Sequence, residues 1–317
     1  MATHHTRQTR REMFSSMAKL AGAALVSQRL LLGDKGTSAA HYAPKLSVEI
    51  YIWIQHLETE KKTLAEGVEE VLASFHGAGY RRVELNQDFF QPALREKTFK
   101  LLAKYNLAPE TIYAGTTLHE AAAAEKSVRE VLELGRLLKA HGTRVIVTNP
   151  SPKPGQAPKT EEELDTQAKY VDQLAADLEQ QGIKLALHHH TPELAEHARE
   201  WHHLLEYTNP RRVYCCVDVH WAYRGGQDVM SFIRETGDRL LELHLRNSHQ
   251  GVWAEDFGPG DIDYQEVADY LRGISFNGYL VVELAYEKET QITRSLDEDL
   301  RLSRLYTDKI FGLPASS

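Results

Sequence analysis

The chain has 317 residues, of which 42% are hydrophobic and 26% charged, and its formal net charge is -8 at pH 7. This length suits a single α/β barrel, and the composition is typical of a folded globular protein. The negative charge argues against a protein that binds nucleic acid through a basic surface. The two cysteines, Cys215 and Cys216, are neighbours in an apolar run. We therefore expect buried free thiols and not a disulfide.

The first forty residues have the features of an export signal. The segment Thr9-Arg10-Arg11-Glu12-Met13-Phe14 resembles a bacterial twin-arginine motif, and small residues that end at Ala40 offer a cleavage site. We predict a twin-arginine signal peptide over residues 1–40, a barrel over 41–317, and a periplasmic or otherwise exported protein. A disordered basic tail is the alternative. The segment is too short and too polar for a convincing membrane span, so no membrane association is expected after processing.

From Lys45 onward the sequence alternates between strand-like and helix-like patterns. The expected strands are 46–54, 82–86, 107–114, 143–148, 185–190, 213–219, 240–246 and 278–284. The expected helices are 60–78, 92–105, 119–140, 161–181, 194–207, 227–236, 264–271 and 291–310. Eight such units without a second compositional domain predict a single (β/α)8 TIM barrel. A doubly wound sheet would show a glycine-rich turn after the first strand, where this chain has Gln55-His56-Leu57-Glu58.

Polar side chains recur where the expected strands end. Catalytic groups of a barrel lie at this end, where each strand passes into its βα loop. Buried Asp, Glu and His need a partner to offset their desolvation, and a metal ion provides one. The polar residues at these ends are Glu84 and Asn86, His188 and His190, Asp218 and His220, His244 and Arg246, and Glu283.

The fifth strand ends in the run His188-His189-His190. Successive side chains of a strand point to opposite faces, so His188 and His190 share a face and His189 points the other way. Neutral imidazole is both a good metal ligand and a good proton carrier. We expect His189 to be structural, whereas His190 is either a proton-transfer group or a contact to substrate. A solvated strand end is the alternative for the whole run.

The last third of the chain resembles a known family. Val217-Asp218, His244-Leu245-Arg246, Gly258-Pro259-Gly260-Asp261-Ile262-Asp263-Tyr264 and the run from Gly278 to Glu283 are similar to the xylose-isomerase-like sugar isomerase/epimerase barrels. This group also includes inosose dehydratase and the endonuclease-IV fold. The resemblance covers residues 46–311 and implies a divalent metal, most often Mn²⁺, with Mg²⁺, Co²⁺ or Zn²⁺ as alternatives. By position the implied ligands are His188, Asp218, His244 and Glu283.

The chain departs from this pattern at the fifth strand. Many epimerases of the family have a glutamate there, which acts as both ligand and base, whereas this chain has His188. The histidine run is closer to the inosose-dehydratase-like branch. The departure disfavours a proton exchange between two carboxylates. It leaves open enolisation and elimination on a keto-sugar or keto-polyol.

The remaining candidates have weaker signals. His190, Glu84 and Glu283 are the candidates for proton transfer, although Glu84 could equally form an ordinary salt bridge. Arg246 is expected either to bind a substrate oxygen or to pair with Glu255 or Asp256. Further substrate-binding candidates are His220 and the three tryptophans at or just beyond expected strand ends. These tryptophans are Trp53, Trp221 and Trp253, and their rings could stack on a sugar or simply pack in loops.

These residues favour a metal-dependent isomerase or epimerase that acts on a small carbohydrate through an enediolate-type intermediate. A sugar or polyol dehydratase is the alternative within the same chemistry. An endonuclease-IV-like phosphodiesterase would need a basic groove, and the net charge disfavours it. A non-catalytic sugar-binding barrel would be favoured by the absence of bound metal. No nucleic-acid partner is expected, and the oligomeric state, including a homo-oligomer, stays open.

Overall fold

The computed structural model describes residues 41–314. The predicted signal peptide over 1–40 lies outside this range. Within it, no helix combines the length and the apolar character that crossing a membrane would require.

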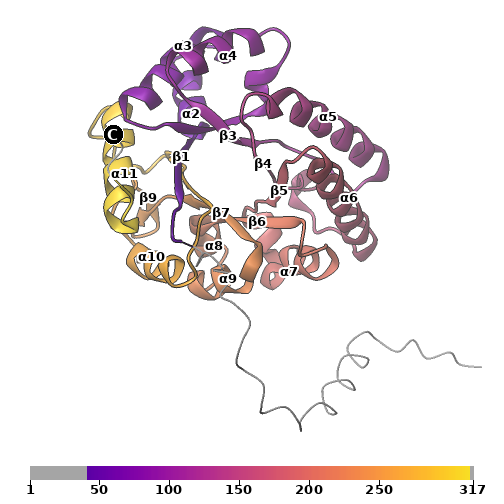
Figure 1. The fold of residues 1–317 in the computed structure, drawn as a ribbon. Helices are drawn as coiled ribbons and strands as arrows, with labels where there is room; N and C mark the ends of the chain where they lie inside the picture. The colour runs from indigo at the N-terminus through magenta and orange to yellow at the C-terminus, as the bar shows by residue number, and fades with distance from the viewer. Residues whose placement is uncertain (1–40, 315–317) are drawn as a thin grey trace, which may run out of the picture. The chain divides into compact units, whose positions relative to one another are not determined.

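Eight parallel strands close into one barrel, with the helices on the outside (Figure 1). Going round the barrel, the order is β1-β10-β7-β6-β5-β4-β3-β2, so each strand pairs with its neighbours in the barrel sequence and the last closes on the first. The predicted (β/α)8 barrel is confirmed. The strands are β1 (Lys45–Glu49), β2 (Arg82–Asn86), β3 (Ala108–Tyr113), β4 (Val145–Thr148), β5 (Lys184–Leu187), β6 (Val213–Asp218), β7 (Leu240–Leu245) and β10 (Tyr279–Val282).

The connections between strands are helical and form the outer layer. They are α2 (Tyr51–Thr59), α3 (Leu64–Gly77), η1 (Gln87–Phe90), α4 (Arg95–Lys104), α5 (Ala121–Lys139), η2 (Pro154–Gln156), α6 (Glu161–Gln180), α7 (Thr191–Tyr207), α8 (Val219–Arg224), α9 (Val229–Glu235), η3 (Gly237–Arg239), α10 (Tyr264–Gly273) and α11 (Leu296–Phe311). A two-stranded hairpin of β8 (Ser248–His249) and β9 (Val252–Trp253) follows β7.

Alternation along each strand separates two surfaces of the barrel. On β5, Leu185 and Leu187 pack in the large cluster between strands and helices, while Ala186 belongs to a smaller cluster inside the barrel. The strand register aligns the ends of neighbouring strands, with Asp218 beside His244 on β6 and β7. Polar residues that follow the apolar runs therefore converge at one end of the barrel.

The first expected strand is too long. The strand β1 ends at Glu49, and the helix α2 begins at Tyr51, whose backbone N–H donates to the Glu49 carboxylate. The residues after the strand read as a continuation of it because they are equally apolar, but α2 buries Ile52, Trp53 and Leu57 on one helical face. The helix expected over 227–236 is likewise preceded by a separate short helix, α8.

Candidate active site

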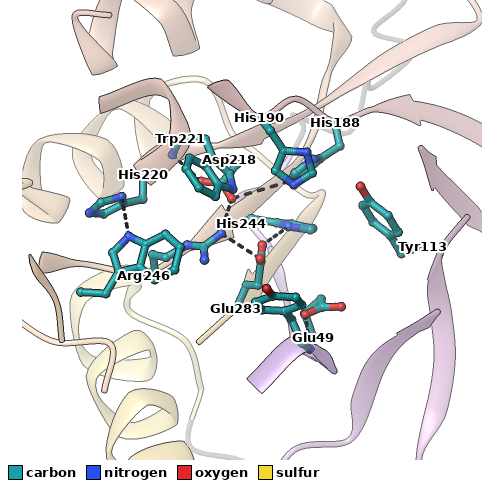
Figure 2. A network of polar contacts seen from close by, with 12 residues as sticks. Glu49, Tyr113, His188, His190, Asp218, His220, Trp221, His244, Arg246 and Glu283 are labelled. Atoms are coloured by element: carbon teal, nitrogen blue, oxygen red, sulfur yellow. Dashed lines mark hydrogen bonds and ion pairs between the residues drawn. The ribbon is translucent and has the colours of Figure 1, made fainter. Parts of the chain in front are cut away.

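Four side chains from consecutive strand ends meet at one end of the barrel (Figure 2). They are His188 after β5, Asp218 at the end of β6, His244 on β7 and Glu283 after β10. One donor atom of each lies within 4.8 Å of the others, and all four side chains are buried. These are the four residues predicted as metal ligands, and the structure brings them together.

Asp218 is held in place by the start of helix α8. Its Oδ1 accepts a hydrogen bond from the backbone N–H of Trp221 at 2.7 Å, which caps the helix. Its Oδ2 lies 3.6 Å from Nε2 of His188 and accepts a hydrogen bond from Arg246 at 2.7 Å. The carboxylate therefore points one oxygen at the helix and the other at the four-residue cluster.

Arg246 bridges the two acidic members of the cluster. Its Nη2 donates to Asp218 Oδ2 and, at 2.8 Å, to Glu283 Oε1. Burial is the largest single influence and would raise the pKa of both carboxyls, but the guanidinium and the neighbouring histidines together outweigh it and keep the pKa of each below its usual value. Pairing of Arg246 with Glu255 or Asp256 is wrong.

The carboxylates of Glu255 and Asp256 bind Arg294 instead, each at 2.9 Å. The sequence alone could not separate the two arginines, because both lie close to acidic residues along the chain. Which carboxylates each arginine binds depends on its position at the barrel mouth.

The cluster fits a divalent cation. Both ring nitrogens of His188 are buried and have no hydrogen-bond partner within residues 41–314, so a donor set of two imidazoles and two carboxylates includes an unused ligand. Such a mixed set suits Mn²⁺, Co²⁺, Fe²⁺ or Zn²⁺ better than Ca²⁺ or Mg²⁺, which favour oxygen ligands alone. Buried polar groups without partners are costly, and a bound ion would satisfy them.

A cavity of about 310 Å³ opens directly onto this cluster. Its walls come from six strands and from α2. The lining residues are Glu49, Tyr51, Ile54, Asn86, Tyr113, His188, His190, His244 and Glu283. This volume is at the lower end of the range for small-molecule sites and accommodates a monosaccharide-sized ligand.

Glu49 is the functional candidate that sequence reasoning missed. It ends β1, faces the cavity beside Glu283 (Figure 2), and is only 7% exposed. Burial, reinforced by the charges of Glu283 and Glu84, holds the pKa of Glu49 well above its usual value. The polar strand-end criterion would have identified Glu49 if the first strand had been predicted to stop there.

His190 contributes the second proton carrier of the cavity wall. Its Nδ1 lies 3.0 Å from the side-chain nitrogen of Asn149, and its backbone N–H donates to Glu193 Oε2 at 2.7 Å. Burial, together with the neighbouring His188, lowers the pKa of His190 to about 3. The imidazole is therefore neutral at pH 7, and its single lone pair, on Nδ1, accepts the hydrogen bond from the Asn149 amide.

His189 points away from the cavity, as predicted. Its ring packs edge-on against Trp201 of α7 and Phe232 of α9, with centroid separations of 4.9 and 5.0 Å. The alternation of the strand thus continues past the last residue of β5, and only His188 and His190 of the run reach the cavity.

Glu84 lies below the cavity and does not line it. The residue is fully buried in the barrel interior, where its Oε1 is 3.0 Å from Nε2 of His244. A second interior carboxyl, Glu242 on β7, lies 3.2 Å from the same nitrogen. The structure therefore places Glu84 against a proposed metal ligand and away from the space available to a substrate.

The predicted substrate-binding aromatic residues divide into two groups. Trp221 and Trp253 pack against each other with centroids 5.4 Å apart, and Arg246 lies over both rings. Trp253 also donates its indole N–H to Nδ1 of His220 at 3.1 Å, so these three form one wall beside Arg246, although none of them is among the residues that line the cavity. Trp53 is not brought to the site, because α2 directs it into the core next to α3.

The motif from Gly258 to Tyr264 supports this wall. Asp261 accepts hydrogen bonds from Ser248 Oγ and from the backbone N–H groups of Gln250 and Gly251, at 2.7–2.9 Å. A Cβ at Gly260 would lie 2.3 Å from the carbonyl oxygen of Ser248, so only glycine fits that approach.

The same motif also reaches the strand that carries the site. Tyr264 donates its hydroxyl to the carbonyl of Arg246 at 2.7 Å. The backbone of β7 is thereby held at the residue that bridges Asp218 and Glu283.

Several curated relatives of this chain are named inosose dehydratases. The chain is 24% identical over 214 residues to an inosose dehydratase of Clostridium perfringens, and this match covers 58% of the chain and 71% of the relative. The inosose dehydratase of Geobacillus kaustophilus is 23% identical over 247 residues, which is 68% of the chain and 79% of that protein.

The solved structures that resemble it have the same fold. L-Ribulose 3-epimerase superimposes with a TM-score of 0.68 at 17% identity, covering 85% of this chain and 95% of the epimerase. D-Allulose 3-epimerase from Methylomonas sp. gives 0.67 at 16% identity, over 86% and 99% of the two chains. The family model described as "Xylose isomerase-like TIM barrel" matches residues 72–305. The chain therefore belongs to the xylose isomerase-like TIM barrel family.

Proposed function

We propose that this protein is a divalent-metal-dependent isomerase or epimerase that acts on a sugar or keto-sugar through an enediolate-type intermediate. One observation carries the proposal: the 310 Å³ cavity joins the four-residue donor cluster to two further proton carriers, His190 and Glu49. A scaffold that only binds a sugar would have no need for this combination of buried titratable groups.

Different residues of the chain would bind the metal and transfer the proton. His188, Asp218, His244 and Glu283 would hold the ion, with Mn²⁺ favoured. When bound, such an ion polarises a substrate carbonyl and stabilises the oxyanion that develops on it. His190, which lines the cavity, would accept the proton from the carbon next to that carbonyl.

Glu49 would complete the proton transfer. It reaches the cavity from β1, whereas His190 reaches it from beyond β5, and these strands are four apart round the barrel. The raised pKa of its carboxyl means that Glu49 can carry a proton to give back to the intermediate. Two carriers on different walls are what inversion at one carbon requires, because the proton leaves one face and returns to the other.

A dehydratase is the second candidate. The curated relatives described above are named inosose dehydratases, and a histidine replaces the glutamate expected of many epimerases at position 188. In a dehydration the same enediolate expels the neighbouring hydroxyl, and Glu49 would donate the proton that this leaving group needs. The two reactions therefore share their first step and differ in the second.

A test in D₂O separates these outcomes. Protein purified with Mn²⁺ would be incubated with D-fructose, D-tagatose and an inosose, and the products followed by NMR and mass spectrometry. An epimerase or isomerase yields a product isomeric with its substrate that carries solvent deuterium, whereas a dehydratase yields a product lighter by one water.

The same assay can reject the proposal. If the protein binds Mn²⁺ but exchanges no deuterium into any keto-sugar or keto-polyol, the proton-transfer chemistry is wrong. If it binds no divalent ion at all, the barrel is a non-catalytic binding protein. Cleavage of a DNA strand that contains an abasic site would favour a phosphodiesterase.

A further inference from the structure

The layer of the barrel interior directly below the candidate site contains two carboxyl groups. Glu84 of β2 and Glu242 of β7 are both fully buried, and both oxygens of Glu84 and Oε2 of Glu242 have no hydrogen-bond partner with acceptable geometry. Inward positions of such a barrel are normally filled by branched apolar side chains. Other inward positions of this barrel follow that rule, with Val145, Val147 and Val281.

Two buried carboxyls are expensive, so their presence requires a function or a compensating partner. They do not line the cavity, and His244 lies between them and the donor cluster. Contact with a substrate is therefore excluded by position. Their shared neighbour is Nε2 of His244, at 3.0 Å from Glu84 Oε1 and 3.2 Å from Glu242 Oε1.

The two nitrogens of His244 face opposite environments. Nδ1 faces the donor cluster and lies 2.6 Å from Glu283 Oε2, whereas Nε2 faces the two interior carboxyls. A neutral imidazole has one N–H donor and one nitrogen lone pair. A carboxyl oxygen that carries no proton accepts hydrogen bonds, so the two oxygens that face Nε2 attract the N–H to that nitrogen and leave the lone pair of Nδ1 directed at the cluster.

We infer that Glu84 and Glu242 are positioning residues that select the tautomer of His244 and so make Nδ1 its ligand atom. This inference rests on the metal site of the proposed function. It replaces the predicted proton-transfer role of Glu84. It also accounts for why two costly acidic residues lie in an interior that touches no substrate.

The inference can be tested without any substrate. Glu84 and Glu242 would each be changed to Gln and to Leu, and the dissociation constants for Mn²⁺ and Zn²⁺ measured by calorimetry. Removing a partner of a ligating histidine typically weakens metal binding by about 10- to 100-fold. We expect a loss in this range for the Leu variants and a smaller loss for the Gln variants, whose amide oxygen still accepts a hydrogen bond.

The tautomer itself provides the decisive signal. In Zn²⁺-loaded protein labelled with ¹⁵N-histidine, we expect the His244 ring of the wild type to carry its proton on Nε2 and to bind through Nδ1. The Gln variants should shift this ring toward a mixture of tautomers, which a purely structural role would not do. These spectra keep the inference testable if a Leu variant fails to fold.

Glu110→Gln is the matched control. Glu110 lies on β3 at the opposite end of the barrel, where it binds Arg82 at 2.8 Å and the hydroxyl of Tyr279 at 2.9 Å. Its loss removes a partly buried carboxylate but should leave metal affinity and the His244 spectrum unchanged.

Three results would overturn the inference. Unchanged metal affinity and unchanged His244 signals in both Gln variants would show that the carboxyl pair does not act on His244. A wild-type His244 that carries protons on both nitrogens in the metal-loaded state would do the same. A second bound ion that disappears in Glu242→Gln would mean that the pair is itself a ligand site. A wild type that binds no ion instead removes the proposed function, which distinguishes the two failures.

Discussion

The inward and outward surfaces of the barrel assign opposite roles to the same residue type. His188 and His189 are neighbours in sequence, and both are buried. His188 faces Asp218 inside the barrel mouth, whereas His189 packs between Trp201 and Phe232 in the helical layer. Burial of a titratable residue is therefore no sign of function by itself. What matters is which face of the strand carries it.

The inward surface also changes along the barrel axis. Near the middle it is mostly apolar, with the side chains of Val145, Ala186 and Val281. Toward the carboxyl ends of the strands it becomes a network of acidic and imidazole groups with one arginine. The buried charge is thus concentrated at the end where a barrel places its chemistry. Substitutions on the inward surface should consequently change metal affinity or turnover, whereas substitutions on the outward surface should change stability alone.

The largest effect is expected at the carboxylates of the donor cluster. Asp218→Asn and Glu283→Gln keep side-chain size but each remove one negative charge that would face a divalent ion. Loss of a group that only hydrogen-bonds a metal ligand already lowers metal affinity by about tenfold. Loss of a charged ligand should lower it by at least as much, and turnover should fall together with the metal content. Equilibrium dialysis with Mn²⁺ measures the affinity.

Melting curves provide a second measurement for these variants. The wild type should melt at a higher temperature with Mn²⁺ than without it, because an ion that binds only the folded state stabilises that state. The variants should lose this difference. Full metal content and full activity in both variants would place the site elsewhere.

The next largest effect is expected on catalysis, with metal binding left unchanged. Glu49→Gln removes a proton carrier from the cavity wall but leaves the four donor residues in place. We expect turnover to fall by about 10²- to 10⁴-fold, the usual contribution of an acid–base group, with unchanged affinity for Mn²⁺. Steady-state kinetics on the substrate found in D₂O would measure this. A fall in metal affinity equal to the fall in turnover would instead make Glu49 a ligand.

A smaller effect should be visible as a pH dependence of stability. Burial raises the pKa of Glu193 to about 7, while its carboxyl accepts a hydrogen bond from the backbone of His190. The folded state thus keeps a proton that the unfolded state releases above its normal pKa, near about 4.3. The stability contributed by this proton is full below about pH 4, and it is lost as pH rises toward 7.

Glu193→Gln cannot ionise and should escape that loss. Relative to the wild type, the variant should gain stability between pH 5 and pH 7, and the difference should level off at higher pH. Urea unfolding at several pH values measures it. A difference that does not vary with pH would mean that Glu193 is ionised in the folded protein at pH 5.

The smallest effect on the site is expected from the outward surface. Both ring nitrogens of His189 are buried without a hydrogen-bond partner among the described residues. His189→Leu replaces this ring with an apolar side chain, so the free energy of unfolding should stay the same or rise. The affinity for Mn²⁺ should not change. Loss of metal in this variant, with retention in His188→Leu, would show that the facing of the two histidines is reversed.

The sequence was sufficient for the barrel because strand alternation and helical spacing are local patterns. It was also sufficient for bringing four residues together, since all four lie at or just after the ends of apolar strands, and these ends must meet. The end of β1 was not predictable in this way. The apolar stretch from Ile50 to Ile54 fits both a strand and a buried helix face, and the error hid Glu49 and misplaced Trp53.

Pairings between distant side chains were beyond the sequence for a different reason. Arg246 and Arg294 both lie near several carboxylates along the chain, and only the three-dimensional positions assign Asp218 and Glu283 to the first and Glu255 to the second. The sequence equally does not show how deep along the barrel axis a residue lies. Glu84 and Glu283 both follow apolar residues of a strand, yet only Glu283 lines the cavity.

The hairpin after β7 has a consequence for how this protein could change over time. Asn247 holds the segment closed, because its side chain donates to the carbonyls of Gly258 and Ile262 while Asp261 binds the turn. The loop therefore carries part of its own framework, while Glu287 and Thr290 of the segment after β10 hold the backbone of Trp253. None of the four donor residues belongs to the hairpin, so a change in it would alter the surroundings of Arg246 and leave the donor set the same.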